Sequence, residues 1–195
     1  PPQHSDAVAV AGGRYLAWGG NSLAAFDRRT RLVIDARSLI PAGLGTLGGL
    51  RIAAADSHQP RLFVRGDRWP AFELWTIDLR GGAPVQLATS SLPISDAAYA
   101  ADTDELFYLE VDFEANARIT WVVAVNATTG QELRRWKLSG IVTAVRTDAT
   151  GRVVWVDHNG IEALDGATGV VLASSNQFTA ANTAVDAPRS LLLIR

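Results

Sequence analysis

The sequence predicts an all-β fold built from repeated units of four antiparallel strands. Short runs of large apolar residues alternate with turns rich in Asp, Asn and Gly, which is typical of strands and hairpins. A helical period of 3.6 residues is nowhere sustained over ten residues. An apolar stretch that ends in Asp, followed by a turn and a second strand, recurs four times. These Asp residues are 46, 46 and 38 positions apart, at Asp56, Asp102, Asp148 and Asp186.

The composition favours a folded domain and excludes several classes of function. The chain has 195 residues, of which 48% are hydrophobic and 19% charged, so it can bury a core. A formal net charge of −2 argues against a nucleic-acid binder and against a polybasic membrane-surface protein. No apolar run approaches the ~18 residues of a membrane span. The absence of Cys excludes disulfides, thiolate nucleophiles and Cys-ligated zinc.

A second marker repeats in phase with the first. Each instance ends an alternating strand with Asp or Asn, continues through small residues, and leads into another apolar strand. Asp and Asn side chains hydrogen-bond their own backbone two residues on, and Gly accepts a positive φ, so these are hairpins. The four hairpins begin at Asp27, Asp78, Asn126 and Asp165.

Together the two markers give the order of elements in each unit. An inner strand leads through the Asp turn to a second strand, then through a loop to a third strand and through the second hairpin to an outer strand. The predicted units are 7–39, 50–91, 93–139 and 140–175, with a partial fifth at 180–195. A repeat of ~40–45 residues with four strands is the signature of a β-propeller blade.

The residues of two segments resemble known propeller repeats. Leu164–Leu172 is similar to the pyrroloquinoline-quinone-like repeat, and Val153–Asp157 resembles the YWTD repeat of lipoprotein-receptor-type propellers. The resemblance implies a β-propeller of four-stranded antiparallel blades. Such rings have roughly six to eight blades. About four and a half blades therefore predict an incomplete ring or a fragment of a larger propeller.

Two loops are the predicted binding sites. The first is the segment Arg65-Gly66-Asp67-Arg68-Trp69-Pro70, expected between the second and third strands of its unit. The second is the corresponding loop of the next unit, with Asp112, Phe113 and Glu114. In propellers these loops open on the usual ligand face, and Arg and Trp dominate binding hot spots. The bland alternative is incidental packing, with a surface ion pair between Asp67 and its arginine neighbours.

The sequence assigns no catalytic, cofactor-binding or metal-ligating residue. No pair of histidines has the spacing of a zinc site, so His58 and His158 are expected in solvated turns. The acidic residues from Asp102 to Glu114 lack the Gly and terminal Glu of a calcium loop. No nucleophile elbow or phosphate-binding motif occurs. A chain without cofactor or metal is therefore expected.

Two further features concern setting and assembly. Asn126-Ala127-Thr128 is an N-glycosylation sequon in a predicted exposed hairpin, which points to an extracellular or secretory-pathway chain; a bacterial periplasmic origin is the alternative. The terminal strand with Leu191, Leu193 and Ile194 would leave an apolar edge open. Because such edges are templates for pairing, we expect it to pair with another chain, with a second copy, or with an N-terminal strand.

The predicted function is therefore non-catalytic recognition of another protein, as part of a receptor ectodomain or a secreted multidomain protein. One alternative is a propeller enzyme of the quinoprotein or hydrolase type whose active-site residues lie outside this chain. A carbohydrate-binding propeller is the third interpretation. It would require a site of paired aromatic and carboxylate residues in every unit, but Trp69 has no counterpart at the same place in every unit. A propeller fold alone does not choose between them.

Overall fold

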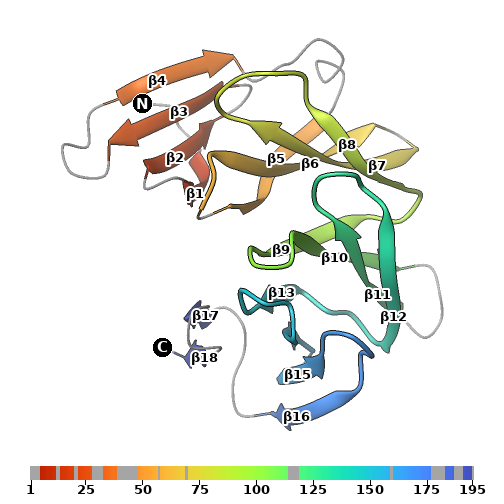
Figure 1. Cartoon of the computed structure of the whole chain (residues 1–195). Helices are drawn as coiled ribbons and strands as arrows, with labels where there is room; N and C mark the ends of the chain where they lie inside the picture. The colour runs from red at the N-terminus through yellow and green to blue at the C-terminus, as the bar shows by residue number, and fades with distance from the viewer. Residues whose placement is uncertain are drawn as a thin grey trace. The chain divides into compact units, whose positions relative to one another are not determined.

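The computed structural model describes two compact units, Pro1–Ser91 (unit 1) and Leu92–Arg195 (unit 2). The described residues are 5–11, 14–19, 22–27, 33–38, 48–56, 58–68, 70–113, 119–158, 160–176, 183–186 and 191–194. Side chains are described within these ranges from residue 51 to residue 176. All regular elements of the described residues are β-strands (Figure 1). Among these residues, no helix is long and apolar enough to cross a membrane.

Unit 1 contains two antiparallel sheets of four strands, and in each sheet the strands follow in chain order. Sheet I consists of β1 (Ser5–Ala11), β2 (Arg14–Gly19), β3 (Ser22–Asp27) and β4 (Val33–Ser38). Sheet II consists of β5 (Gly48–Ala55), β6 (Arg61–Arg68), β7 (Ala71–Asp78) and β8 (Val85–Ser90). Leu62, Val64 and Ile77 form a buried cluster in sheet II, with Trp75 packed against it.

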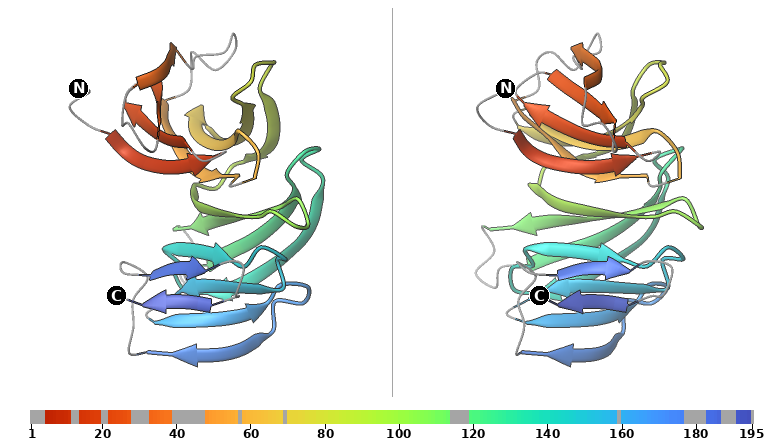
Figure 2. Two further views of the ribbon diagram at one scale, coloured as in Figure 1. Left: turned by 60° about the vertical axis from the view of Figure 1, so that its left-hand side comes forward. Right: turned by 90° about the vertical axis from the view of Figure 1, so that its left-hand side faces the viewer.

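Unit 2 contains two more such sheets and a strand pair (Figure 2). Sheet III consists of β9 (Ile94–Ala100), β10 (Glu105–Asp112), β11 (Ile119–Asn126) and β12 (Glu132–Ser139). Sheet IV consists of β13 (Ala144–Thr147), β14 (Val153–Asp157), β15 (Ile161–Asp165) and β16 (Val171–Ser175). The pair, sheet V, consists of β17 (Thr183–Asp186) and β18 (Leu191–Ile194).

A buried Asp closes the first hairpin in sheets II and IV. Asp56 and Asp148 are only 1% and 2% exposed. The Asp56 carboxylate accepts the backbone N–H groups of His58 and Gln59 at 2.8 and 3.0 Å. The Asp148 carboxylate accepts the Thr150 hydroxyl at 2.8 Å. Each side chain therefore satisfies turn groups that a four-residue loop leaves without backbone partners.

Sheet III departs from the predicted repeat at this position. Asp102 lies inside the turn and is exposed, and the buried residue that stands before the four-residue loop is Ala100. The equivalence of Asp102 with Asp56 and Asp148 was therefore wrong by two residues. The polar contacts of this turn come instead from Asp104, which has a φ of 54° and accepts the Tyr99 and Thr128 hydroxyls at 2.9 and 2.7 Å.

The second hairpins of sheets III and IV are built alike. The side-chain oxygen of Asn126 accepts the backbone N–H groups of Thr128 and Thr129 at 3.1 and 2.8 Å. Asp165 accepts those of Ala167 and Thr168 at 3.1 and 2.8 Å. Each turn ends in a Gly with positive φ, 75° at Gly130 and 72° at Gly169. These are the Asx turns that the sequence predicts.

In sheets II, III and IV, one backbone hydrogen bond joins the two hairpins that lie at the same end of the sheet. The residue after the Asp or Asn of the second hairpin donates its N–H to the carbonyl of the last residue in the first turn. The three bonds are Leu79 to Pro60 (2.7 Å), Ala127 to Asp104 (2.8 Å) and Gly166 to Arg152 (2.7 Å). The repeat therefore extends from sequence to hydrogen bonding.

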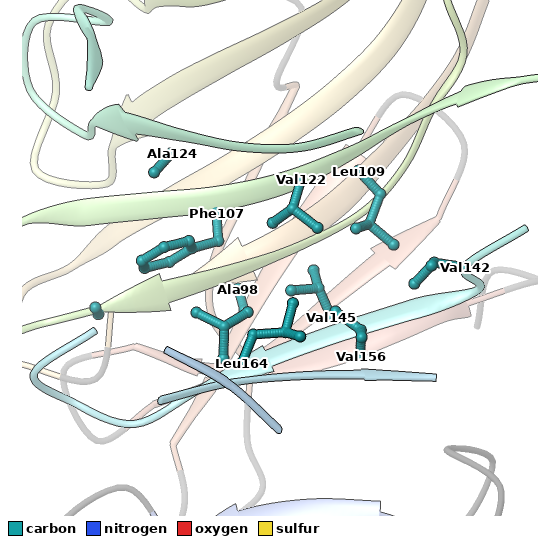
Figure 3. Packing of buried hydrophobic residues seen from close by; sticks show 11 residues of the cluster. Ala98, Phe107, Leu109, Val122, Ala124, Val142, Val145, Val156 and Leu164 are labelled. Atoms are coloured by element: carbon teal, nitrogen blue, oxygen red, sulfur yellow. The ribbon is translucent and has the colours of Figure 1, made fainter. Parts of the chain in front are cut away.

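The core of unit 2 lies between sheets III and IV (Figure 3). Phe107, Leu109 and Val122 of sheet III face Val145, Val156 and Leu164 of sheet IV, and all six are buried. Alternation of side chains along each strand puts these residues on one face. Trp136 of the outer strand β12 packs against the same cluster, with its ring stacked on Phe107 at 6.0 Å between centroids.

Polar contacts also connect the two sheets. The Asp96 carboxylate of β9 accepts the Val145 N–H at 3.0 Å and pairs with Arg146 at 2.8 Å. The buried hydroxyl of Thr120 donates to the Gly140 carbonyl at 2.9 Å and accepts the Val142 N–H at 3.0 Å. The connection from sheet III to sheet IV is thereby held against β11.

Candidate interaction site

The two predicted binding segments lie at equivalent ends of sheets II and III. In a four-stranded meander, the turn between the second and third strands is at the end where the first strand begins. The β6–β7 hairpin of sheet II and the β10–β11 turn of sheet III are such turns. The first belongs to unit 1 and the second to unit 2, so they are two separate candidate surfaces.

At the end of sheet II, the predicted loop is largely a strand. Residues 65–68 continue β6, with Arg65 paired to Leu74, Asp67 to Phe72 and Arg68 to Ala71. The prediction of a loop from residue 65 was therefore wrong. The segment is polar because Asp67 and Arg68 are exposed where β6 reaches the end of the sheet, and the backbone stays within the sheet. Trp69 lies outside the described residues.

The charges at this end form a different ion pair from the expected one. Arg68 lies 3.7 Å from the buried carboxylate of Glu73, which also accepts the indole N–H of Trp75 at 3.0 Å. The Asp67 carboxylate is exposed and makes no ion pair within the described part of the chain. Arg68 thus neutralises a buried acid, and Asp67 is the charge that remains available to a partner.

At the end of sheet III, an aromatic ring stands in solvent. Asp112 is the last residue of β10 and pairs with Ile119. Phe113 follows it with 58% of its surface exposed, and it is the only aromatic side chain classed as exposed among the described residues. Glu114 lies outside the described residues. The ring therefore presents apolar area that binding of a partner would remove from water.

The other predicted chemistry resolves into local contacts. His58 is exposed in its turn, and His158 is half-buried with Nδ1 at 4.0 Å from Glu162. Glu105 pairs with Arg134, and Glu110 pairs with Arg135 at 2.6 Å. Within the described ranges, no group of three or more His, Cys, Asp or Glu side chains could hold a metal ion.

The sequence reasoning missed a cluster on β11 and β12. Trp121 of β11 is half-buried. The Arg135 guanidinium and the Lys137 ammonium each lie 5.8 Å from the centre of its ring. The signal in the sequence was the alternation of Arg135 and Lys137 along a strand. Their pairing with Trp121 depends on a register that only the structure gives.

Charge pairing is strong around Arg135. Its guanidinium donates to Glu132 at 2.8 and 3.1 Å and to the buried Glu110 at 2.6 Å. The hydrogen bond from Arg135 lowers the pKa of Glu132. Burial, with the neighbouring Glu110 carboxylate, raises the pKa of Tyr108, whose hydroxyl lies 3.4 Å from Glu110.

Comparison with solved structures shows the fold. No protein-family description matches the sequence, and no curated protein matches it either. The crystal structure of a nidogen/laminin complex superimposes with a TM-score of 0.63 at 15% identity, over 89% of this chain and 64% of that one. Sqt1 of Saccharomyces cerevisiae gives 0.55 at 11% identity, over 85% and 45%. The Cps50 (Swd1) β-propeller domain of Myceliophteria thermophila gives 0.51 at 13% identity, over 78% and 49%.

The fold is a β-propeller. The four-stranded antiparallel sheets are its blades, which confirms the predicted fold class. The chain spans between 45% and 64% of the length of these three neighbours. At 11–15% identity the likeness establishes the fold and carries over no site residue.

Proposed function

We propose that this chain is a protein-recognition module that catalyses no reaction. It binds a partner through the end of each sheet that carries the turn between the second and third strands. The exposed ring of Phe113 carries the proposal. Aromatic residues are enriched at the cores of protein interfaces, and they supply a large apolar area at a small cost in side-chain entropy. One fold neighbour was solved as a complex of nidogen with laminin, which supports protein binding as a use of this fold.

The experiment compares two exposed apolar residues of one sheet. Phe113→Ser removes the ring at the proposed binding end, and Leu133→Ser removes an apolar side chain of 40% exposure at the opposite end. Both variants and the wild type serve as immobilised baits for proteins from the source organism. We expect proteins that wild type and Leu133→Ser retain and Phe113→Ser loses. For such a protein, Phe113→Ser should weaken binding about 30-fold, the hot-spot scale of ~2 kcal/mol.

Equal retention by the two variants, with unchanged far-UV circular dichroism, would overturn the proposal for this surface.

For the surface at the end of sheet II, Asp67→Asn is the cleaner test of binding. Arg68→Ala would leave the buried Glu73 without its cation, so a loss of binding there would be confused with a loss of stability.

We further propose that the module acts in the secretory pathway, as part of a receptor ectodomain or a secreted protein. The Asn126 sequon supports this setting. Its Oδ1 is engaged in the hairpin, but no hydrogen bond within the described part of the chain uses Nδ2, the atom that carries a glycan. A glycan there would leave the Asx turn intact.

Self-association through β18 is the second partner contact that we propose. Among the described strands, β18 has one neighbour, β17, with Leu191 paired to Asp186 and Ile194 to Thr183. The side chains of Leu191, Leu193 and Ile194 lie outside the described residues. An edge of this composition favours pairing with a further strand. Light scattering that finds wild type and Ile194→Lys equally monomeric and equally stable would exclude it.

A further inference from the structure

Trp121 and Lys137 belong to one face of sheet III. In the β11–β12 register Trp121 stands opposite Lys137, and in the β10–β11 register it stands opposite Glu110. Because directly opposite residues of an antiparallel pair lie on the same face, these three side chains are neighbours across three strands. Arg135, two residues before Lys137 on β12, lies on this face as well.

Lys137 is the cation of this face that has no carboxylate partner among the described residues. The Arg135 guanidinium is divided between Glu110 and Glu132. Lys137 is exposed and is the only lysine of the chain. Within the described residues its ammonium makes no ion pair, and its neighbour is the Trp121 ring at 5.8 Å. The indole N–H of Trp121 likewise makes no hydrogen bond to a described residue.

The strand that carries Lys137 is also an outer strand. β12 stands at the end of the order of sheet III, has eight residues, and pairs with β11 alone among the described strands. An outer strand presents unpaired backbone N–H and C=O groups that an extended segment can use. On β12, Glu132, Arg134 and Arg135 all take part in ion pairs. Lys137 is therefore the one charged side chain of this strand without an ion pair among the described residues, and it makes its end of the strand cationic.

We propose that the outer edge of β12 docks an extended acidic segment of a partner protein, with a carboxylate on Lys137 and an apolar side chain against Trp121. Charge complementarity selects the occupant. One ammonium above an aromatic ring suits a single carboxylate, because opposite charges directly across a strand pair stabilise the pairing. A nucleic acid would require several free cations, and the chain has a net charge of −2. The proposal does not rest on the Phe113 surface.

Because Lys137 is the only side-chain amine, chemical crosslinking reports on it directly. The probe is a blocked heptapeptide of sequence Thr-Glu-Thr-Val-Thr-Glu-Thr, whose Glu and Val side chains lie on one face of an extended strand. The same peptide with Gln in place of Glu is the control. A water-soluble carbodiimide joins a Glu carboxyl to a nearby amine as an amide. We expect the Glu peptide to crosslink to Lys137, identified by mass spectrometry, and to shift the indole N–H resonance of Trp121. The Gln peptide should shift it at least tenfold less at equal concentration.

Three variants separate recognition from mere stability. Lys137→Gln and Trp121→Leu should each weaken binding of the Glu peptide at least tenfold. Arg152→Gln, which removes another exposed cation without an ion pair in the described residues, should leave it unchanged. Equal binding of the Glu and Gln peptides would overturn the proposal. So would competition by a single-stranded oligonucleotide at the same concentration, because the site would then be a general anion site.

One more outcome would overturn it. Lysines on sheet edges also act as gatekeepers against aggregation. The outcome has two parts: Lys137→Gln increases light scattering, and both Lys137→Gln and Trp121→Leu bind the Glu peptide as tightly as the wild type does. Lys137 would then protect the edge from aggregation and would not recognise a partner.

Discussion

Gly166→Ala should destabilise unit 2 strongly, although the change adds a single methyl group. A Cβ built at Gly166 would lie 2.9 Å from the carbonyl carbon of Gly151 and closer still to its oxygen. Real Cβ atoms do not approach backbone this closely, so one of the two hairpins of sheet IV must move. The movement would also break the 2.7 Å hydrogen bond from the Gly166 N–H to the Arg152 carbonyl.

The expected magnitude follows from these two terms. Overpacking against rigid backbone costs about 1–3 kcal/mol, and loss of the hydrogen bond costs about 1 kcal/mol. The sum is about 2–4 kcal/mol. With an m-value of ~2 kcal/mol/M in urea, the midpoint of unfolding should fall by about 1–2 M. Equilibrium unfolding followed by far-UV circular dichroism, with hydrogen exchange of the peptides that cover 149–170, measures both the size and the place of the effect.

Ala127 provides the matched control. It occupies the equivalent position in sheet III and donates the equivalent hydrogen bond, to the Asp104 carbonyl at 2.8 Å. Ala127→Gly removes a buried methyl group that this turn accommodates. It should cost about 1–2 kcal/mol, from ~0.5–1 kcal/mol of added backbone entropy and ~0.8 kcal/mol of lost apolar burial. If Gly166→Ala shifts the midpoint by no more than Ala127→Gly does, the two turns of sheet IV are not in the tight contact described.

Three further predictions concern single polar groups. Asp165 has a pKa below its ordinary 3.8 because of the hydrogen bonds from Thr168. The ionised Asp165 therefore contributes stability above pH ~3.8, and this contribution is lost as the pH falls through the pKa of the folded state. Amide exchange at Thr168 should become faster in that pH range in the wild type but not in Asp165→Asn. Thr120→Val should cost about 1–3 kcal/mol by leaving a buried N–H and C=O without a partner, whereas Thr120→Ser should unfold near the wild-type urea midpoint. Secreted from eukaryotic cells, the chain should lose mass on treatment with an N-glycosidase and Asn126→Asp should not; an unchanged wild-type mass would contradict the proposed modification.

Local chemistry explains what the sequence predicts well. The hairpins at Asn126 and Asp165 were predictable because the Asx side chain, the small residues and the Gly all act within five positions of one another. Alternating strands between such hairpins determine a four-stranded meander. Because the blade spacing follows from these local signals, the propeller class was predictable without any long-range contact.

Register explains what the sequence did not predict. Whether Arg65–Arg68 is loop or strand depends on where β7 begins to pair, and polar residues occur in both. The wrong equivalence of Asp102 has a similar cause. In sheet III, Ala100 takes the buried position before the turn and Asp104 accepts the hydrogen bonds, whereas in sheets II and IV a single Asp does both. The cluster of Trp121 with Arg135 and Lys137 was not predicted because the two cations lie on a strand whose alignment no local pattern specifies.

The cluster between sheets III and IV has a consequence for folding. Each sheet closes its own hairpins, but Phe107 and Val122 are covered only when Val145 and Leu164 of the next sheet are in place. The cooperative element is therefore the seam between two neighbouring sheets, not the single sheet. A substitution that loosens this seam should therefore lower the hydrogen-exchange protection of sheets III and IV together.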